Sequence, residues 1–209
     1  MSGFFISFEG GEGTGKSTQS ARLAAELAKT GKEVLLTREP GGTPAGEALR
    51  NLLVTGDTNR WSAKAEAMLN AAARDVHVRD VIAPALTLGK LVISDRFMDS
   101  TRAYQGFAGG CDFDLIDSLE RAAVGSCRPQ LTLIFDLDPT LGLARAKTRG
   151  GGLEDRYERK GLAFHQKLRQ GFLAIADSQS ERCVVVNANQ GVEAVYEEVR
   201  KIVTARLYG

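Results

Sequence analysis

The stretch "FEGGEGTGKST" at residues 8–18 decides the fold of this chain. A short apolar run, residues 4–10, leads into it, and a segment with helical spacing of apolar residues, residues 16–31, follows it. Gly10 to Ser17 match the pattern G-x-x-x-x-G-K-[ST] in the strand-to-helix context that this pattern requires. The stretch therefore predicts a phosphate-binding loop rather than a chance glycine turn.

Each position of the loop has an expected task. Glycines let backbone N–H groups turn inward around phosphate oxygens, and the following helix adds its positive N-terminal end. Lys16 is expected to reach the terminal phosphates of a nucleotide, and the Ser17 hydroxyl to bind Mg²⁺. The predicted phosphate-binding residues are Gly10, Gly11, Glu12, Gly13, Thr14, Gly15, Lys16, Ser17 and Thr18. Glu12 is unexpected here, because a carboxylate repels phosphate.

The rest of the chain alternates strands and helices. Further strands are predicted at 33–39, 90–97, 130–138 and 182–189. Helices are predicted at 43–54, 63–89 with a bend or break near Pro84, 114–125, 139–149, 162–178 and 191–207. Near-continuous apolar strands between helices are typical of a parallel sheet covered on both faces. We therefore expect one α/β domain, residues 1–209, with a doubly wound five-stranded sheet.

Composition excludes several classes of protein. The 209 residues are 43% hydrophobic and 25% charged, with a net charge of +1, so no strong field for nucleic acid or an anionic membrane is expected. The sequence predicts no signal peptide, and no apolar run has the roughly 20 residues that span a bilayer. The three cysteines form no CxxC pair, which favours reduced thiols and a cytoplasmic protein.

Two further features point to phosphate chemistry. Asp95 and Arg96 in "VISDRF" lie at the carboxyl end of a predicted strand, the edge of the sheet where ligands bind. Asp95 is therefore expected to contact Mg²⁺ or its waters, and Arg96 to bind a phosphate. A surface ion pair is the alternative interpretation. The polar, glycine-rich segment 149–161 contains Arg149 and Arg156, and we interpret it as a short lid over a transferring phosphate. A solvated loop is the alternative interpretation of this segment.

The class of phosphate-loop protein can be narrowed. A GTPase would need an Asn-Lys-x-Asp stretch, which is absent, and a motor ATPase would need an acidic pair that "FDLDPT" only approximates. Small size, a second arginine for a phosphate and a lid favour a kinase that acts on a small phosphorylated acceptor.

The motifs "FEGGEGTGKST", "TREPGGT", "DRFMDSTRAYQG" and "DRYE", in this order and spacing, resemble the bacterial thymidylate kinase family. The resemblance covers essentially the whole chain, and the second and third motifs discriminate better than the phosphate loop. It implies a five-stranded kinase core, phosphorylation of dTMP to dTDP with ATP and Mg²⁺ in the dTTP pathway, and a homodimer.

The resemblance also implies roles for individual residues. Lys16, Arg96, Arg149 and Arg156 are the implied catalytic cations, and Ser17 and Asp95 the implied metal-side residues. Glu12 would accept a hydrogen bond from the 3′-hydroxyl of the acceptor sugar, which would explain an acid in this loop. The implied acceptor-binding residues are Glu12, Glu39, Pro40, Arg50, Arg74, Arg96, Thr101, Tyr104 and Gln105.

Several residues have simpler interpretations. Arg74 and His77 could be exposed helix positions, Tyr104 could pack on the sheet edge, and Arg50 could pair with Glu47 on its own helix. The chain also departs from the family at two positions. Asn70 stands where an aromatic residue often stacks on the base, and Arg102 stands where a neutral residue is common; Arg102 could touch a phosphate or a partner subunit.

Other functions stay open at this point. A kinase for another nucleoside monophosphate or a deoxynucleoside is the alternative within enzymes. A phosphate-loop ATP-binding regulator, or a nucleic-acid-dependent ATPase, is the alternative from another class. The near-neutral charge argues against the latter.

Overall fold

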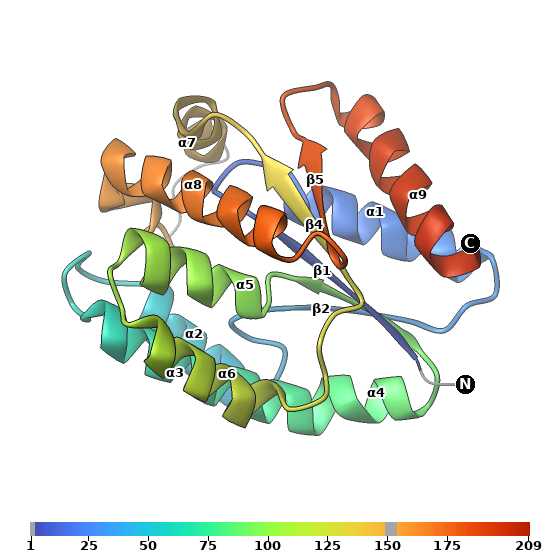
Figure 1. Cartoon of the computed structure of the whole chain (residues 1–209), viewed down its shortest axis with the longest axis horizontal. Helices are drawn as coiled ribbons and strands as arrows, with labels where there is room; N and C mark the ends of the chain where they lie inside the picture. Colours follow the sequence, from blue (N-terminus) through green and yellow to red (C-terminus); the bar gives the residue numbers. More distant parts are fainter. Residues whose placement is uncertain (1–2, 149–153) are drawn as a thin grey trace.

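Five parallel strands form one sheet in the part of the chain that the computed structural model describes, residues 3–148 and 154–209. The strand order is β2-β3-β1-β4-β5, and the strands span Phe4–Gly10 (β1), Val34–Arg38 (β2), Leu91–Asp95 (β3), Leu131–Asp136 (β4) and Cys183–Asn187 (β5). In the register of the sheet, Phe8 of β1 lies opposite Asp95 of β3, and Gly10 of β1 lies opposite Phe135 of β4. The carboxyl ends of the three central strands therefore meet at the phosphate loop (Figure 1).

Helices cover both faces of this sheet. They span Lys16–Lys29 (α1), Pro44–Val54 (α2), Ala63–His77 (α3), Ala83–Thr87 (α4), Met98–Thr101 (α5), Phe113–Val124 (α6), Pro139–Thr148 (α7), Leu162–Ser178 (α8) and Val192–Tyr208 (α9). Two π-helical segments, Val78–Ile82 (η1) and Arg102–Ala108 (η2), and a 3₁₀ turn, Glu158–Lys160 (η3), complete the described elements. The predicted doubly wound α/β fold is confirmed.

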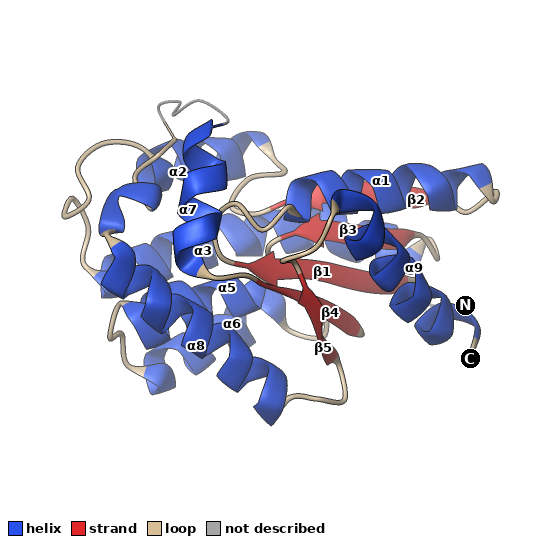
Figure 2. Cartoon of the chain, turned by 90° about the horizontal axis from the view of Figure 1, so that it is seen from above, coloured by secondary structure: helices blue, strands red, loops and turns tan. Residues whose placement is uncertain are grey.

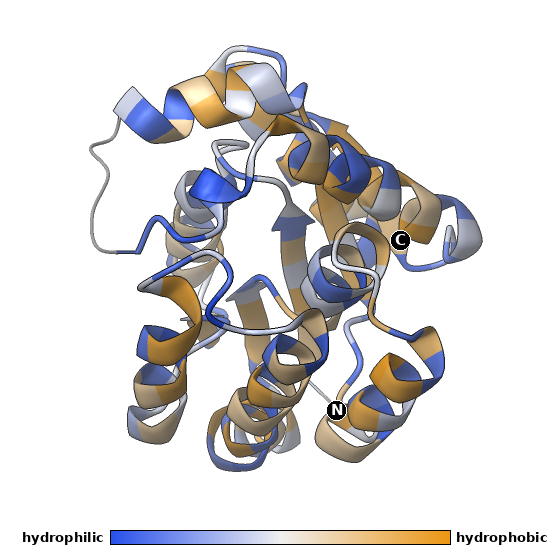
Figure 3. Ribbon diagram, turned by 90° about the vertical axis from the view of Figure 1, so that its left-hand side faces the viewer, coloured by the Kyte–Doolittle hydropathy of each residue, from blue (hydrophilic) through white to orange (hydrophobic). Residues whose placement is uncertain are grey.

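Alternation along β1 divides the core between two layers. Ile6 and Phe8 pack with residues of α1 and α9 on one face, whereas Phe5 packs with residues of η1, α4 and α6 on the other. Figure 2 shows α1 and α9 on one side of the sheet and α6 and α8 on the other. In Figure 3 the helices alternate polar and apolar stretches along their length, as expected for helices with one buried face.

The structure refines one detail of the predicted helices and adds another. The helix predicted at 63–89 is interrupted near Pro84 as expected: the π-helical segment η1 ends at Ile82, two residues before Pro84, because proline offers no backbone N–H to the α-helical ladder. A helical segment at 98–108, α5 followed by η2, was not predicted. Its buried side chains mix apolar residues with polar ones, Asp99, Thr101 and Gln105, so polar residues interrupt its apolar pattern.

No helix within residues 3–148 and 154–209 is long and apolar enough to cross a membrane. In the same residues the three cysteines, Cys111, Cys127 and Cys183, are free thiols.

Candidate functional site

The phosphate loop has the backbone that its glycines predict. Gly10, Gly13 and Gly15 have φ values of 138°, 68° and 89°, a region that favours glycine. At Gly13 a Cβ atom would lie 1.9 Å from the carbonyl oxygen of Gly142, so only glycine fits there. The loop thereby turns from β1 into α1 with Lys16 at the first turn of the helix.

Lys16 is buried and only partly satisfied. Its Nζ donates to the backbone oxygen of Gly11 at 2.6 Å and to Oγ1 of Thr14 at 3.1 Å. Burial, and next the charge of Arg96, lower the pKa of Lys16 to about 8, although Glu12 and Asp95 act in the opposite direction. Lys16 therefore has capacity for a further anionic partner.

A polar pocket, here called the loop pocket, opens above the phosphate loop. It is lined by residues Gly13 to Ser17, by Arg38 and Asp95, and by Glu12, Glu39, Arg50 and Arg96. The Ser17 hydroxyl donates to a carboxylate oxygen of Asp95, so two hard oxygen donors lie together. The described residues contain no group of three or more His, Cys, Asp or Glu side chains that could hold a metal. A cation at Ser17 and Asp95 would therefore need ligand phosphates and water, as Mg²⁺ in kinases commonly does.

Glu12 lines the loop pocket, but its carboxylate is also bonded to neighbouring side chains. Its Oε1 accepts from the Tyr104 hydroxyl at 2.6 Å and from Nη2 of Arg96 at 3.1 Å. Burial by itself would raise the pKa of Glu12, but Arg96 and Lys16 outweigh it and hold the pKa at about 2. Glu12 is therefore a carboxylate compensated by cations, which explains how the loop tolerates an acid.

A second pocket, here called the side pocket, adjoins the first. The two pockets share the lining residues Glu12, Glu39, Arg50 and Arg96. The side pocket is otherwise lined by Pro40, Leu53, Val54, Asn70, Ser100, Thr101, Tyr104, Gln105, Glu154, Tyr157 and Glu158. A ligand in the loop pocket and one in the side pocket would therefore meet at Glu12 and Arg96.

Arg74 lies behind the wall of the side pocket and is not exposed on its helix. Its Nε donates to Glu39 at 2.7 Å, and its Nη2 donates to the Phe97 carbonyl and to the Thr101 hydroxyl, each at 3.1 Å. His77, fully buried, bonds the other oxygen of Glu39 through Nδ1 at 2.9 Å. The interpretation of Arg74 and His77 as exposed helix positions is wrong.

Glu66 on α3 organises the deep side of the same pocket. Its carboxylate accepts from Nε2 of Gln105 at 2.8 Å and from the Tyr157 hydroxyl at 3.1 Å. Asn70 donates to the Glu66 backbone oxygen at 2.9 Å and lines the pocket where an aromatic residue was expected in the family. Tyr157, which the sequence analysis did not single out, contributes an aromatic ring to the lining.

Tyr104 packs in an aromatic cluster rather than on a bare sheet edge. Its ring centroid lies 5.2 Å from that of Tyr157 and 6.2 Å from those of Phe164 and Phe172. The cluster leaves the Tyr104 hydroxyl directed at Glu12. Tyr104 therefore has both roles: its ring packs in the aromatic cluster, and its hydroxyl donates a hydrogen bond to Glu12.

Arg50 reaches across the mouth of the side pocket. Its Nε and Nη2 donate to the two carboxylate oxygens of Glu154 at 3.2 and 2.7 Å, and its Nη1 donates to the Pro40 carbonyl at 3.0 Å. Glu47 instead bonds Arg38 and the N–H of Gly42, so the predicted alternative pair with Arg50 does not form.

The two lid arginines have different outcomes. Arg149 lies outside the described residues. Arg156 is fully buried: its guanidinium donates to Glu66 at 2.5 Å and to the carbonyls of Leu53, Asp57 and Thr58 at 2.8 to 3.1 Å. In the described part of the chain it lines neither pocket. The structure thus places Arg156 in a buried anchor for the segment 154–161, not over a phosphate as expected.

Arg102 is not among the described residues that line the two pockets. It forms ion pairs with Asp117 and with Glu120, at 3.5 Å for the latter, on α6, and its guanidinium lies 5.6 Å from the centre of the Phe113 ring. The structure thus gives Arg102 partners within its own chain. Two other residues missed from sequence, Glu9 and Ser100, lie beside Arg96, and are described below.

Comparisons with known proteins agree with this geometry. The family model described as thymidylate kinase matches residues 8–199. A thymidylate kinase from Caulobacter vibrioides is 52% identical over 98% of both chains, and one from a Bradyrhizobium species is 48% identical over 99% of this chain and 92% of its own. The crystal structure of thymidylate kinase from Ehrlichia chaffeensis is similar with a TM-score of 0.77 and 35% identity, covering 97% of this chain and 99% of its own. Because the family model and these full-length relatives match nearly the whole chain, this chain belongs to the thymidylate kinase family.

Proposed function

We propose that this chain phosphorylates dTMP to dTDP with ATP, by direct in-line transfer between the two pockets. One observation carries the proposal for the site: the loop pocket and the side pocket adjoin and share Glu12 and Arg96. Two nucleotides that must bring their phosphates together need such a common wall. Family membership supplies the identity of the two nucleotides.

In this proposal the loop pocket holds the ATP phosphates. Backbone N–H groups of the glycine loop and the N-terminal end of α1 face the phosphates, and Lys16 supplies a buried positive charge. Because Lys16 has no carboxylate in ion-pair contact within the described chain, a phosphate would be its strongest partner.

The side pocket holds dTMP in the same proposal. Arg96 binds the acceptor phosphate and aligns its attacking oxygen, and Arg50 adds a second guanidinium at the pocket mouth. Glu12 accepts a hydrogen bond from the sugar 3′-hydroxyl, and Tyr104 packs against the sugar carbon that lacks a hydroxyl. Thr101 and Gln105 serve the thymine edge, with Glu39 and Pro40 beside them. Arg74 supports this edge from behind the pocket wall, through its hydrogen bonds to Thr101 and Glu39. The acceptor phosphate has a second pKa of roughly 6, so it needs no general base near neutral pH.

The Ser17 hydroxyl and the Asp95 carboxylate are the proposed protein contacts for Mg²⁺. When bound, Mg²⁺ would neutralise charge on the ATP phosphates. Ser17 and Asp95 hold each other through their hydrogen bond, so both oxygens are oriented before a metal arrives.

We keep Arg149 as a proposed lid cation on the resemblance alone. Arg156 would have to leave Glu66 and three carbonyls to reach a phosphate, so we propose that it anchors the lid segment. A homodimer and a cytoplasmic location are also proposed. The family and the free cysteines support these, and sedimentation at low concentration tests the dimer.

A coupled assay with ATP and dTMP, dUMP, dCMP, AMP or thymidine tests the proposal directly. We expect dTMP to have the highest kcat/KM and thymidine to be inactive, since thymidine lacks the phosphate that Arg96 would bind. A preference for another acceptor would overturn the substrate. ATP hydrolysis stimulated by DNA without dTDP would indicate the ATPase alternative.

A further inference from the structure

Glu9 is a buried carboxylate beside the phosphate loop that the proposed mechanism does not use. It precedes Gly10 in β1 and is completely shielded from solvent. Burial, and next the neighbouring Asp99, raise the pKa of Glu9 to about 8, although hydrogen bonds and Arg96 act against this. Because a carboxylate in such surroundings is costly, its position calls for a role.

The carboxylate of Glu9 accepts two hydrogen bonds, both from the chain directly after Arg96. Oε1 accepts from the backbone N–H of Phe97 at 2.8 Å, and Oε2 accepts from the Ser100 hydroxyl at 2.5 Å. The Ser100 oxygen in turn accepts from Nη1 of Arg96 at 3.2 Å. A hydrogen-bonded chain therefore runs from the Arg96 guanidinium through Ser100 to Glu9.

The backbone of Arg96 needs such support. Among the described residues, Arg96 is the one non-glycine residue with a positive φ, 69°. Side chains other than glycine avoid this region because of steric crowding, and such residues persist only where neighbours hold them. The N–H of Arg96 donates to the Phe8 carbonyl at 2.9 Å, and the next N–H, of Phe97, donates to Glu9. Two consecutive residues of β1 therefore hold two consecutive peptides of this turn.

We propose that Glu9 is a positioning residue for Arg96, fixing its left-handed turn directly and its guanidinium through Ser100. The inference rests on the proposed function, in which Arg96 binds the acceptor phosphate. Glu9 thereby links the end of β1, which leads into the phosphate loop, to Arg96, which aligns the acceptor phosphate. The same nitrogen of the guanidinium, Nη1, also donates to the Gly10 carbonyl at 2.9 Å.

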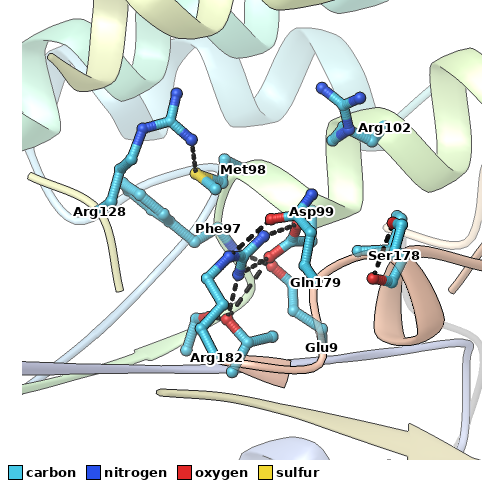
Figure 4. A network of polar contacts seen from close by, with 12 residues as sticks. Glu9, Phe97, Met98, Asp99, Arg102, Arg128, Ser178, Gln179 and Arg182 are labelled. Atoms are coloured by element: carbon cyan, nitrogen blue, oxygen red, sulfur yellow. Dashed lines mark hydrogen bonds and ion pairs between the residues drawn. The ribbon is translucent and has the colours of Figure 1, made fainter. Parts of the chain in front are cut away.

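A neighbouring buried carboxylate provides a matched control. Figure 4 shows Glu9 close to Asp99 and Arg182 in one network. Arg182 donates to both oxygens of Asp99 at 2.8 and 2.7 Å, and Thr132 lies within 3.5 Å of one of them. Asp99 is as fully buried as Glu9, but its side-chain hydrogen bonds in the described chain go to Arg182 and Thr132 and not to the Arg96 turn. Asp99 acts on Glu9 through its charge alone.

The test compares Glu9→Gln with Asp99→Asn in steady-state assays of dTMP phosphorylation, with melting temperatures measured alongside. The assays are run at pH 9, above the Glu9 pKa of about 8, where Glu9 is ionised. Glutamine then keeps an oxygen for Phe97, but its amide nitrogen cannot accept the Ser100 proton. We expect Glu9→Gln to lower kcat/KM for dTMP about tenfold, in line with the loss of a hydrogen bond to a charged group, and to leave KM for ATP unchanged. Asp99→Asn is expected to lower the melting temperature and leave kcat/KM for dTMP unchanged.

Two outcomes overturn the inference. Equal melting losses for both variants with unchanged dTMP kinetics would make Glu9 structural only. If Glu9→Gln does not fold, Ser100→Ala takes its place, because it cuts the chain to the guanidinium and keeps the bond to Phe97; unchanged dTMP kinetics in that variant would also overturn it. If Glu9→Gln and Ser100→Ala both fold, the effect of the double variant should be smaller than the sum of the two single effects, since both interrupt the same hydrogen-bonded chain.

Arg96→Ala separates this inference from the proposed function. If Arg96→Ala keeps normal use of dTMP, the proposed role of Arg96 fails first. If Arg96→Ala is severely impaired and Glu9→Gln is normal, only the inference about Glu9 fails.

Discussion

Lys16 in the phosphate loop and Arg156 in the segment 154–161 are both buried cations, but their surroundings are opposite. Lys16 has one carbonyl and one hydroxyl as partners, and it lines the loop pocket. Arg156 has a carboxylate and three carbonyls around it, and it lines neither pocket in the described chain. The first charge is left for a ligand, whereas the second is already neutralised by the protein.

The difference teaches how to separate binding cations from structural ones. A buried cation short of partners gains most from an arriving anion, and it destabilises the fold until then. A buried cation with full partners stabilises the fold and cannot be removed cheaply, because its carboxylate would be left behind. Variants at these two positions should therefore affect different quantities.

The largest effect is expected from Arg156→Met. It leaves Glu66 without its shortest ion pair, so we expect the free energy of unfolding to fall by about 3–5 kcal/mol, measured by urea denaturation. The folded fraction should keep its kcat. Arg159→Met is the control, because Arg159 is half exposed and pairs with Asp155 at the surface, where such a pair contributes about 0–1 kcal/mol. Normal stability with a large loss of kcat would indicate that Arg156 binds a phosphate, and Arg156 would then resemble Lys16.

Lys16→Ala should show the reverse pattern. We expect kcat to fall about 10²- to 10³-fold, because a preorganised charge on the transferring phosphate is lost. The melting temperature should not fall, since a poorly compensated buried charge disappears as well. Wild-type turnover in this variant would refute the assignment of the phosphate loop.

Glu12→Gln sharpens the boundary between the two pockets. We expect KM for dTMP to rise about tenfold with little change in ATP affinity, because Glu12 faces the shared wall and bonds Tyr104 and Arg96. An acceptor without the 3′-hydroxyl should lose most of this sensitivity. A change in ATP affinity alone would assign Glu12 to the loop pocket only.

The smallest effect concerns pH. The pKa of Lys16, about 8 in the free protein, means that Lys16 is charged below this pH and loses its proton above it. The affinity for ATP should therefore fall as the pH rises, by about fourfold between pH 7 and 8.5, as measured by titration calorimetry. Lys16→Arg stays charged across this range, so a slope that persists in that variant would exclude Lys16 as its source.

The sequence predicts the parts of this molecule that depend on local rules. Glycines in the phosphate loop are required by its backbone, and apolar strands mark a covered parallel sheet, so both are legible in the sequence. The helical segment 98–108 escapes this approach because the polar residues Asp99, Thr101 and Gln105 are buried among its apolar ones and interrupt the helical pattern.

Long-range partners also escape it. Arg50 binds Glu154 rather than the nearby Glu47, whose carboxylate already bonds Arg38 and the backbone of Gly42. Arg156 finds its carboxylate on a helix that lies about ninety positions earlier in the chain. Spacing along the sequence contains no information about either choice.

The left-handed conformation of Arg96 has a consequence for attempts to stabilise this enzyme. Glycine at position 96 would relieve a backbone cost of about 1–2 kcal/mol, so selection for heat resistance alone would favour it. The same change would delete the guanidinium shared by both pockets. Position 96 is thus a point of direct trade-off, where resistance to heat is exchanged for turnover.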